Sequence, residues 1–379
     1  MSNRESIGYP LLLRPRLDEK VWGGQRLEAL LGKAARGGVI GESLETCDEA
    51  VIANGPHAGS TLGELASGYP EALLGARGLA ASQPFGDFPL LVKFIDATDI
   101  LSLQVHPDDD GAAHLGKRGK TEAWHVIEAD PGAELIVGVD PSATGTQLRS
   151  AIEAGTIESL ILRRPVKAGD TLIVRAGTIH AIAGGVLLYE IQQNSDVTFR
   201  LYDWERVDDR GRSREVHLDQ ALVAMTPGLQ ATRIDPIRLD ATRSFLTACR
   251  YFTVERWSVN RDYTVPGLDG ASFRVLSCLS PVATIAAGGV NLELQRGQSA
   301  LLPADVAGCR VSADSDLLCS WIADLTDDVA RPLLAAGREP REITLLGGGT
   351  SDLLGAVALA QRDRALATGN APASLSPAS

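Results

Sequence analysis

Apolar residues fall along most of this chain in short runs that Gly, Pro and Asp interrupt, a pattern typical of β-strands joined by turns. Such runs predict strands at residues 88–96, 101–106, 123–128, 134–139, 170–175, 186–192 and 197–203. Helical periodicity is scarcer, and it predicts helices at residues 62–74, 146–154, 218–225 and 352–366. Short strands at this spacing favour an antiparallel sandwich or barrel over a doubly wound parallel sheet.

One stretch of this pattern occurs twice. Residues 167–177 resemble residues 295–305 at an offset of 128, and each copy turns at a Gly, forms a short apolar strand and turns again. His180 follows the first copy, whereas Ala307 stands at the position we assign to it in the second. The repeat predicts two related barrels, of which only the first keeps a side chain able to bind a metal.

The chain therefore divides into three expected parts. Residues 1–240 would form the metal-binding barrel and residues 241–330 a degenerate barrel without metal ligands. Residues 331–379 would form a C-terminal helix and a disordered tail, because the last residues are mostly small residues, Pro and Ser.

Composition narrows the class of protein. Asp and Glu number 48 against 36 Lys and Arg, which gives a net charge of −12 and disfavours nucleic acid as a partner. The chain has neither an 18-residue apolar stretch nor the apolar core of a secretory signal, so we expect no membrane partner. Its five cysteines contain no Cys-x-x-Cys pair, which favours reduced thiols in a cytoplasmic protein.

Several polar side chains converge if these strands form one barrel. Alternate residues of a strand share a face, so Ser102, Gln104 and His106 point the same way, as do Lys120 and Glu122 on the next strand. Two imidazoles, one carboxylate and one amide oxygen suit Zn²⁺ with positions left open, and they also suit the Fe(II) of non-haem oxygenases. The candidate ligands are Gln104, His106, Glu122 and His180.

The same residues carry a resemblance to a known family. Gly169, Arg175, Gly177 and His180 are spaced like the second cupin motif, and Gln104-x-His106 with Glu122 resembles a variant of the first. The whole arrangement resembles type I mannose-6-phosphate isomerase, also called phosphomannose isomerase. The matching blocks span most of residues 10–204 in family order, at residues 20–24, 41–43, 102–108, 119–124, 176–182 and 190–204.

The resemblance implies a mainly β fold of two cupin-type (jelly-roll) β-barrels with a few short helices. It implies one zinc ion per chain, bound by the four candidate ligands, and a place in mannose metabolism and GDP-mannose biosynthesis. It also brings in Glu190 and Asp196, marks Arg200 as an essential active-site arginine, and places Ser102 and Lys120 near the substrate phosphate. We expect a monomer whose partner is a small sugar phosphate.

The expected reaction is the zinc-dependent interconversion of mannose 6-phosphate and fructose 6-phosphate through an enediol(ate). The expected catalytic residues are Arg200, Glu190 and Lys120, and the expected substrate-binding residues are Ser102, Lys120, Asp196 and Arg200. Glu190 is the candidate base, with zinc-bound hydroxide, Lys120 and Asp196 as competitors, and Asp196 is alternatively the residue that orients Arg200. The rival functions are an Fe(II) cupin oxygenase and a non-catalytic cupin that binds sugar phosphates.

Three features depart from the family pattern. Gly119 stands where larger members have His, so that position supplies no general base. Arg175 replaces the usual Pro and adds a cation near the metal-binding strand. The chain lacks the long helical insert of the fungal and enteric forms, so it resembles the compact bacterial form with a C-terminal extension that the family does not explain.

Overall fold

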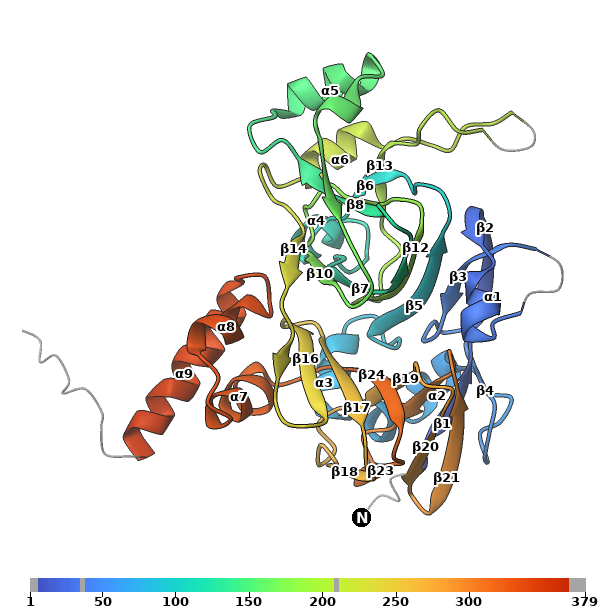
Figure 1. Ribbon diagram of the computed structural model, residues 1–379, viewed down its shortest axis with the longest axis vertical. Helices are drawn as coiled ribbons and strands as arrows, with labels where there is room; N and C mark the ends of the chain where they lie inside the picture. Colours follow the sequence, from blue (N-terminus) through green and yellow to red (C-terminus); the bar gives the residue numbers. More distant parts are fainter. Residues whose placement is uncertain (1–5, 35–37, 208–210, 368–379) are drawn as a thin grey trace, which may run out of the picture.

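The computed structural model describes residues 6–34, 38–207 and 211–367 (Figure 1). It is mainly β, with 35% of residues in strands and 23% in helices, which confirms the expected fold class at this level. The predicted tail at residues 368–379 lies outside the described residues. Within the described ranges, no helix has both the length and the hydrophobicity to cross a membrane.

A seven-stranded sheet forms the centre of what we call the first sandwich, with strand order β14-β10-β7-β12-β5-β3-β2. It faces a three-stranded sheet of order β11-β8-β9, beside which β6 and β13 pair. The large sheet contains β2 (Arg16–Gly24), β3 (Ile40–Leu44), β5 (Leu90–Ala97), β7 (Glu122–Ala129), β10 (Thr171–Val174), β12 (Val186–Gln193) and β14 (Thr232–Ile234). The smaller sheets contain β6 (Leu103–Val105), β8 (Glu134–Val139), β9 (Ile161–Pro165), β11 (Ala181–Ile182) and β13 (Phe199–Tyr202).

The second sandwich pairs an eight-stranded sheet, of order β15-β16-β17-β24-β19-β22-β1-β4, with a four-stranded sheet of order β18-β23-β20-β21. The larger sheet contains β1 (Leu11–Arg14), β4 (Val51–Ile52), β15 (Ile237–Arg238), β16 (Arg243–Ala248), β17 (Thr253–Val259), β19 (Arg274–Cys278), β22 (Ser299–Leu302) and β24 (Ser315–Trp321). The smaller contains β18 (Tyr263–Pro266), β20 (Val282–Ala287), β21 (Val290–Gln295) and β23 (Gly308–Val311). Because β1 pairs with β22, the N-terminal strand belongs to the sheet of the second sandwich.

The two large sheets pack back to back, which explains the apolar runs of the central strands. On β12, Val186 and Leu188 face the interior of the first sandwich, whereas Leu187 and Tyr189 join the core shared with the second. The Tyr189 hydroxyl lies 2.7 Å from that of Ser320 on β24, a hydrogen bond between the two sandwiches. Strands buried on both faces lose the alternation of a half-exposed strand, so β5, β10 and β12 consist mostly of consecutive apolar residues.

Helices lie at the ends and sides of the sheets, with α5 and α6 at one end of the first sandwich and α7, α8 and α9 together on one side of the molecule (Figure 1). The predicted helix at residues 62–74 is two helices, because the first ends before Tyr69 and Pro70 begins the second. The other predicted helices agree with α5, α6 and α9 to within a few residues. The helices are α1 (Arg26–Leu31), α2 (Leu62–Gly68), α3 (Pro70–Ser82), α4 (Asp109–Ala113), α5 (Gly145–Glu153), η1 (Ile157–Ser159), α6 (Leu218–Ala224), η2 (Leu325–Ala330), α7 (Arg331–Ala335), α8 (Pro340–Leu345) and α9 (Ser351–Ala367).

The sequence repeat corresponds to equivalent strands. Strands β10 and β22 have the same bounds at the offset of 128, and the order β10-β7-β12-β5 recurs as β22-β19-β24-β17. The same offset places Gly308 opposite His180, so the assignment of Ala307 to that position was wrong by one residue. All of the described sheets have open strand orders, so closed barrels are not confirmed.

Gly75 provides a test of the contact between α3 and the second sandwich. Its φ of 67° and ψ of 179° lie in a region essentially restricted to glycine, and a Cβ there would lie 2.5 Å from the carbonyl oxygen of Gly270. We expect Gly75→Ala to destabilise the protein by about 2–3 kcal/mol through strain and overpacking. Thermal unfolding would measure this, with Gly68→Ala as control because a Cβ at Gly68 meets no atom within 4 Å. An unchanged melting temperature for Gly75→Ala would contradict the prediction.

Candidate metal centre and active site

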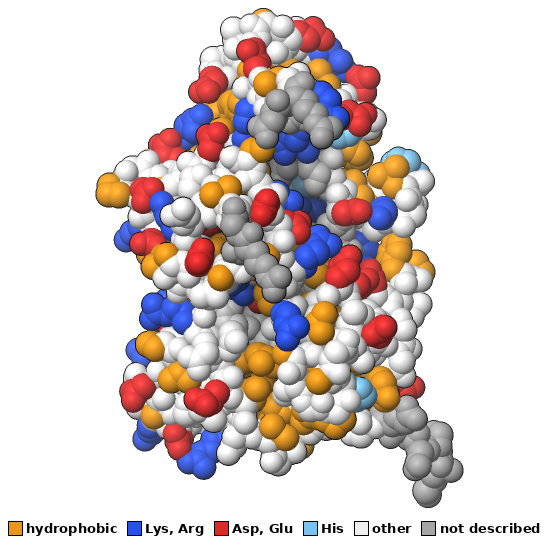
Figure 2. Space-filling view, turned by 90° about the vertical axis from the view of Figure 1, so that its right-hand side faces the viewer, with side chains coloured by type: hydrophobic (Ala, Val, Ile, Leu, Met, Phe, Trp, Pro, Cys, Tyr) orange, Lys and Arg blue, Asp and Glu red, His pale blue; other side chains and the backbone are white. Residues whose placement is uncertain are grey.

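A cavity of about 790 Å³ opens along the first sandwich, between strands of the large sheet and the loops that precede β7 and follow β12. Figure 2 shows Lys and Arg side chains gathered around the hollowed middle of this face, beside Asp and Glu. The cavity lining includes Ser102, Gln104, Lys120, Glu190, Asp196 and Arg200. The fold therefore brings these six predicted site residues to one cavity.

The predicted metal ligands lie together at one part of the first sandwich. His106 follows β6, Glu122 begins β7, and His180 immediately precedes β11. One ligand atom from each of these three buried residues lies within 4.8 Å of the others. Gln104 completes the predicted set, since its Nε2 atom lies 3.4 Å from Nε2 of His180.

Hydrogen bonds fix the orientation of both imidazoles. Nδ1 of His106 lies 2.8 Å from the carbonyl oxygen of Val197, and Nδ1 of His180 lies 2.8 Å from that of Thr178. A carbonyl oxygen only accepts, so each Nδ1 carries the proton and donates it. Each Nε2 faces Glu122, at 3.5 Å for His106 and 3.2 Å for His180, the orientation found in metal-binding histidines.

The cluster has the protonation states and the unmet bonding capacity that a cation requires. Burial and the ammonium of Lys120 hold the pKa of His106 well below its usual value, so the ring is neutral. Burial would raise the pKa of Glu122, but Lys120 and the two imidazoles hold it well below its usual value. Nε2 of His106 and both Glu122 carboxylate oxygens are buried without a hydrogen-bond partner among the described residues, which is costly unless a ligand compensates. These residues therefore fit a bound divalent metal.

Lys120 and Glu190 both line the cavity. Nζ of Lys120 lies 3.2 Å from Oε2 of Glu122. Glu190 on β12 is buried; its Oε2 accepts a hydrogen bond of 3.0 Å from Nε1 of Trp124, and its Oε1 lies 3.1 Å from Nζ of Lys93. Two donors thus hold the Glu190 carboxylate in a fixed position facing the cavity.

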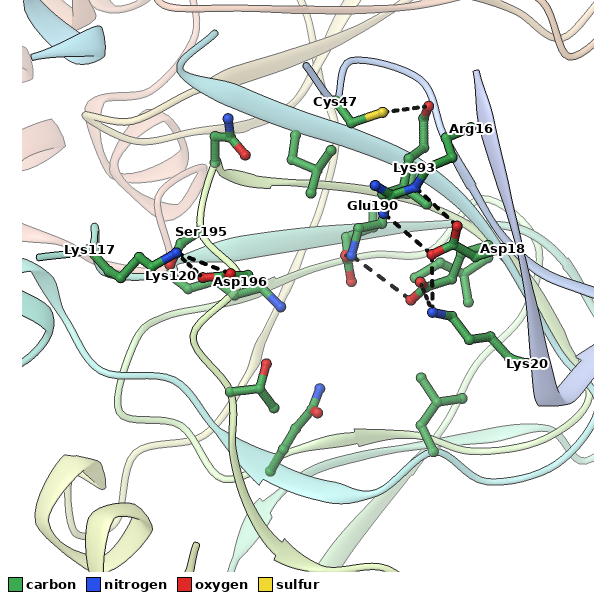
Figure 3. A pocket seen from close by; sticks show the side chains of 18 of the residues that line it. Arg16, Asp18, Lys20, Cys47, Lys93, Lys117, Lys120, Glu190, Ser195 and Asp196 are labelled. Carbon is green, nitrogen blue, oxygen red and sulfur yellow. Dashed lines mark hydrogen bonds and ion pairs between the residues drawn. The ribbon is translucent and has the colours of Figure 1, made fainter. Parts of the chain in front are cut away.

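A row of alternating charges, none of them among the predicted site residues, continues from Glu190 along the cavity wall (Figure 3). Lys93 lies 3.9 Å from Glu42, Glu42 lies 3.0 Å from Lys20, and Lys20 lies 3.2 Å from Asp18. Burial would lower the pKa of Lys93, but Glu190 and Glu42 raise it, so this lysine stays charged. The sequence signal was a lysine inside an apolar strand.

Arg200 and Asp196 interact with different partners. Arg200 donates from its guanidinium to the carbonyl oxygen of Glu215 at 2.6 Å, and its backbone N–H bonds Nδ1 of His217 at 3.3 Å. Asp196 is mostly exposed and pairs with Lys117 at 3.1 Å (Figure 3). In the described structure, Asp196 therefore pairs with Lys117 rather than orienting Arg200.

The structure shows the surroundings of two residues that depart from the family pattern, Gly119 and Arg175. A Cβ at Gly119 would lie 2.4 Å from the backbone carbon of Asp108 and 2.4 Å from the nitrogen of Asp109, so this chain has no room for a histidine there. Arg175 is not among the residues that line the cavity. The extra cation predicted near the metal-binding strand therefore lies outside the cavity wall.

Comparison with known proteins identifies relatives over most of the chain. The model of the family described as "Mannose-6-phosphate isomerase, cupin domain" matches residues 241–322. The mannose-6-phosphate isomerase of Streptococcus mutans is 35% identical over 321 residues, which covers 83% of this chain and 98% of that protein. The mannose-6-phosphate isomerase ManA of Bacillus subtilis is 33% identical over 324 residues, covering 83% of this chain and 99% of that protein.

Solved structures show the same fold. The crystal structure of mannose 6-phosphate isomerase from Bacillus subtilis aligns with a TM-score of 0.74 and 32% identity, covering 82% of this chain and 99% of that one. The apo form of mannose 6-phosphate isomerase from Salmonella typhimurium aligns with a TM-score of 0.64 at 15% identity, covering 83% of this chain and 99% of that one. At that identity, the second match supports the fold alone.

Proposed function

Because the chain belongs to the mannose-6-phosphate isomerase family, we propose that it interconverts mannose 6-phosphate and fructose 6-phosphate with zinc as its metal. One observation carries the proposal beyond family membership: His106, Glu122 and His180 form a buried cluster, in which Nε2 of His106 and both Glu122 oxygens lack a hydrogen-bond partner among the described residues. That cluster lies beside a cavity whose wall includes Lys120, Glu190 and Arg200.

Gln104, His106, Glu122 and His180 would hold the zinc ion, one per chain. When bound, zinc supplies a Lewis acid that stabilises negative charge on the oxygens of an enediol(ate). The mixture of two imidazoles, one carboxylate and one amide oxygen is compatible with zinc and leaves positions open.

Glu190 is the residue that we propose moves the proton between C1 and C2 of the sugar. Its carboxylate is buried and is held in place by Trp124 and Lys93. It is not one of the proposed metal ligands, so it stays available to accept a proton. A base fixed in this way contributes about 10²–10⁴-fold to a rate. Lys120 would assist, since its ammonium lies within 3.2 Å of Glu122 and can stabilise an oxyanion. Asp196 competes less well as the base because it is exposed and paired with Lys117.

The remaining polar residues would bind the phosphate and orient the sugar. A hydroxyl from Ser102 and the charges of Lys120 and Arg200 suit a phosphate dianion. Asp196 would bind sugar hydroxyls at the cavity rim. The net charge of −12 repels such a substrate, but salt screens exposed charges beyond about 8–10 Å, so cations in the cavity wall determine binding.

We further propose two cupin-type units, with residues 1–240 catalytic and residues 241–330 free of metal; three strands of the first range, β1, β4 and β15, complete the large sheet of the second sandwich. The register that pairs Val174 with Glu122 in the first sandwich pairs Leu302 with Arg274 in the second, so an arginine stands at the carboxylate position. Arg274 donates to the carbonyl oxygen of Pro266 at 2.8 Å. A buried cation here supports a second unit that holds no metal ion.

The five cysteines are free and buried, which supports a reducing, cytoplasmic location. We propose that the protein acts there as a monomer.

A coupled assay for fructose 6-phosphate formed from mannose 6-phosphate tests this function directly, together with metal analysis of the purified protein. Turnover with stoichiometric zinc is the expected result. Oxygen consumption with bound iron would instead indicate an oxygenase. Saturable binding of the sugar phosphate without turnover would indicate a sugar-phosphate-binding cupin.

A further inference from the structure

The carboxylate of Asp109, at the start of α4, accepts hydrogen bonds from three separate segments of the chain. Its Oδ1 accepts from the backbone N–H of Gly119 at 3.0 Å and from Nε2 of Gln193 at 2.9 Å. Its Oδ2 accepts from the hydroxyl of Tyr251 at 2.8 Å and from Arg250 at 3.3 Å. The first two donors belong to the first sandwich and the last two to the second. We call Asp109, Gln193, Arg250 and Tyr251 the latch.

The latch fixes the backbone on both sides of Lys120. Asp109 holds the N–H of residue 119, and Oε1 of Gln193 accepts from the N–H of Thr121 at 2.9 Å. The N–H of Lys120 itself donates to the carbonyl oxygen of Pro107 at 3.0 Å. Three consecutive amides are therefore bound, and they direct the Lys120 side chain toward Glu122, 3.2 Å from its Nζ.

The second sandwich holds the other end of the latch. Arg250 and Tyr251 form the turn between β16 and β17, which the bond from Cys249 N to Phe252 O closes at 2.9 Å. Arg250 stacks over the Tyr251 ring, 4.7 Å from its centroid, and also donates to its hydroxyl at 2.6 Å. Asp352, at the start of α9, accepts from the backbone N–H of Arg250 at 2.9 Å. The C-terminal helices, which follow the family match ending at residue 322, thus support this turn.

We propose that Asp109 and Tyr251 are positioning residues for Lys120, through which the second sandwich contributes to the active site of the first. The inference rests on the proposed isomerase function and on the role given there to Lys120. The second sandwich, which has no metal donors at the positions equivalent to Glu122 and His180, would thereby have a function in catalysis. Tyr251 acts through Asp109 and Gln193, and it does not itself touch the substrate.

Tyr251→Phe removes one hydroxyl and is expected to lower kcat about 10- to 100-fold, since misplacing a catalytic group by about 1 Å costs up to about 10²-fold. KM should change much less than kcat, and zinc content should not change. The matched control is Tyr263→Phe, which also removes a tyrosine–aspartate bond in the second sandwich, that of Tyr263 to Asp240 at 3.0 Å, away from the cavity. Tyr263→Phe should leave kcat unchanged.

A second comparison separates positioning from general support of the fold. In a Lys120→Ala background, Tyr251→Phe should cause no further loss of residual turnover, because the residue that it positions is absent. A loss of equal factor in both backgrounds, or an unchanged kcat in the single variant, would overturn the proposal. Asp109→Asn provides the same test if the tyrosine variant does not fold. An inactive wild type would contradict the proposed function instead, so the two failures are distinguishable.

Discussion

Chelation of the bound metal is expected to lower turnover by about 10³-fold or more, and Glu122→Gln should do the same without a chelator. Stabilisation of a developing oxyanion by a Lewis acid supplies several kcal/mol, and each 1.4 kcal/mol corresponds to a tenfold rate. Glutamine keeps the volume of Glu122 but lacks the charge that faces His106 and His180, so the variant should lose metal affinity as well.

Metal content by mass spectrometry and the coupled isomerase assay check this prediction together. Adding zinc back should restore the chelated wild type but not Glu122→Gln at the same zinc concentration. Glu128→Gln is the matched control, because Glu128 lies on the same strand, β7, with its side chain exposed. Full turnover by protein that contains no metal would remove the metal from the proposed mechanism.

Replacing Arg200 with Ala is expected to lower turnover by about 10²–10³-fold while leaving zinc content intact. The loss of one preorganised donor to a developing oxyanion has an effect of that size. Arg200 lines the cavity, and its guanidinium is anchored at one nitrogen by the carbonyl oxygen of Glu215. Its Nε is buried without a hydrogen-bond partner among the described residues, so the guanidinium has donor capacity that no described residue uses.

Arg200→Lys tests whether charge alone is sufficient. Lysine keeps the positive charge but loses the planar fork, so it should recover only a small part of the lost rate. Arg149→Ala serves as the control, since Arg149 forms an exposed pair with Asp219 outside the cavity lining. A near-normal rate for Arg200→Ala would exclude this arginine from the chemistry, and a loss of zinc would indicate a structural role instead.

Local patterns in the sequence were sufficient to predict many of the strands and helices. The run at residues 134–139 has the same bounds as β8, and the predicted helix at 218–225 ends one residue beyond α6. Polar–apolar periodicity is a short-range property, so it can be read without knowing what a segment packs against. The offset of 128 likewise identified two strands that proved to be structurally equivalent.

The candidate metal-binding cluster was also predictable, but its surroundings were not. Glu122, His106 and His180 have side chains whose chemistry identifies them wherever the fold places them together. Lys93 gave only a weak signal, because a buried lysine is understood only once its partners are known. Those partners, Glu42 and Glu190, come from neighbouring strands on either side of β5, a pairing that no local pattern specifies.

The sequence by itself predicted the strands, the repeat and the candidate donor residues, because these depend on residue type and on spacing along the chain. The tertiary structure alone decided that β1 joins the second sandwich, that Asp196 pairs with Lys117, and that Tyr251 reaches Asp109. These are contacts between residues distant in sequence. They depend on how two sheets pack back to back, which is set by the summed burial of many apolar side chains rather than by any single motif.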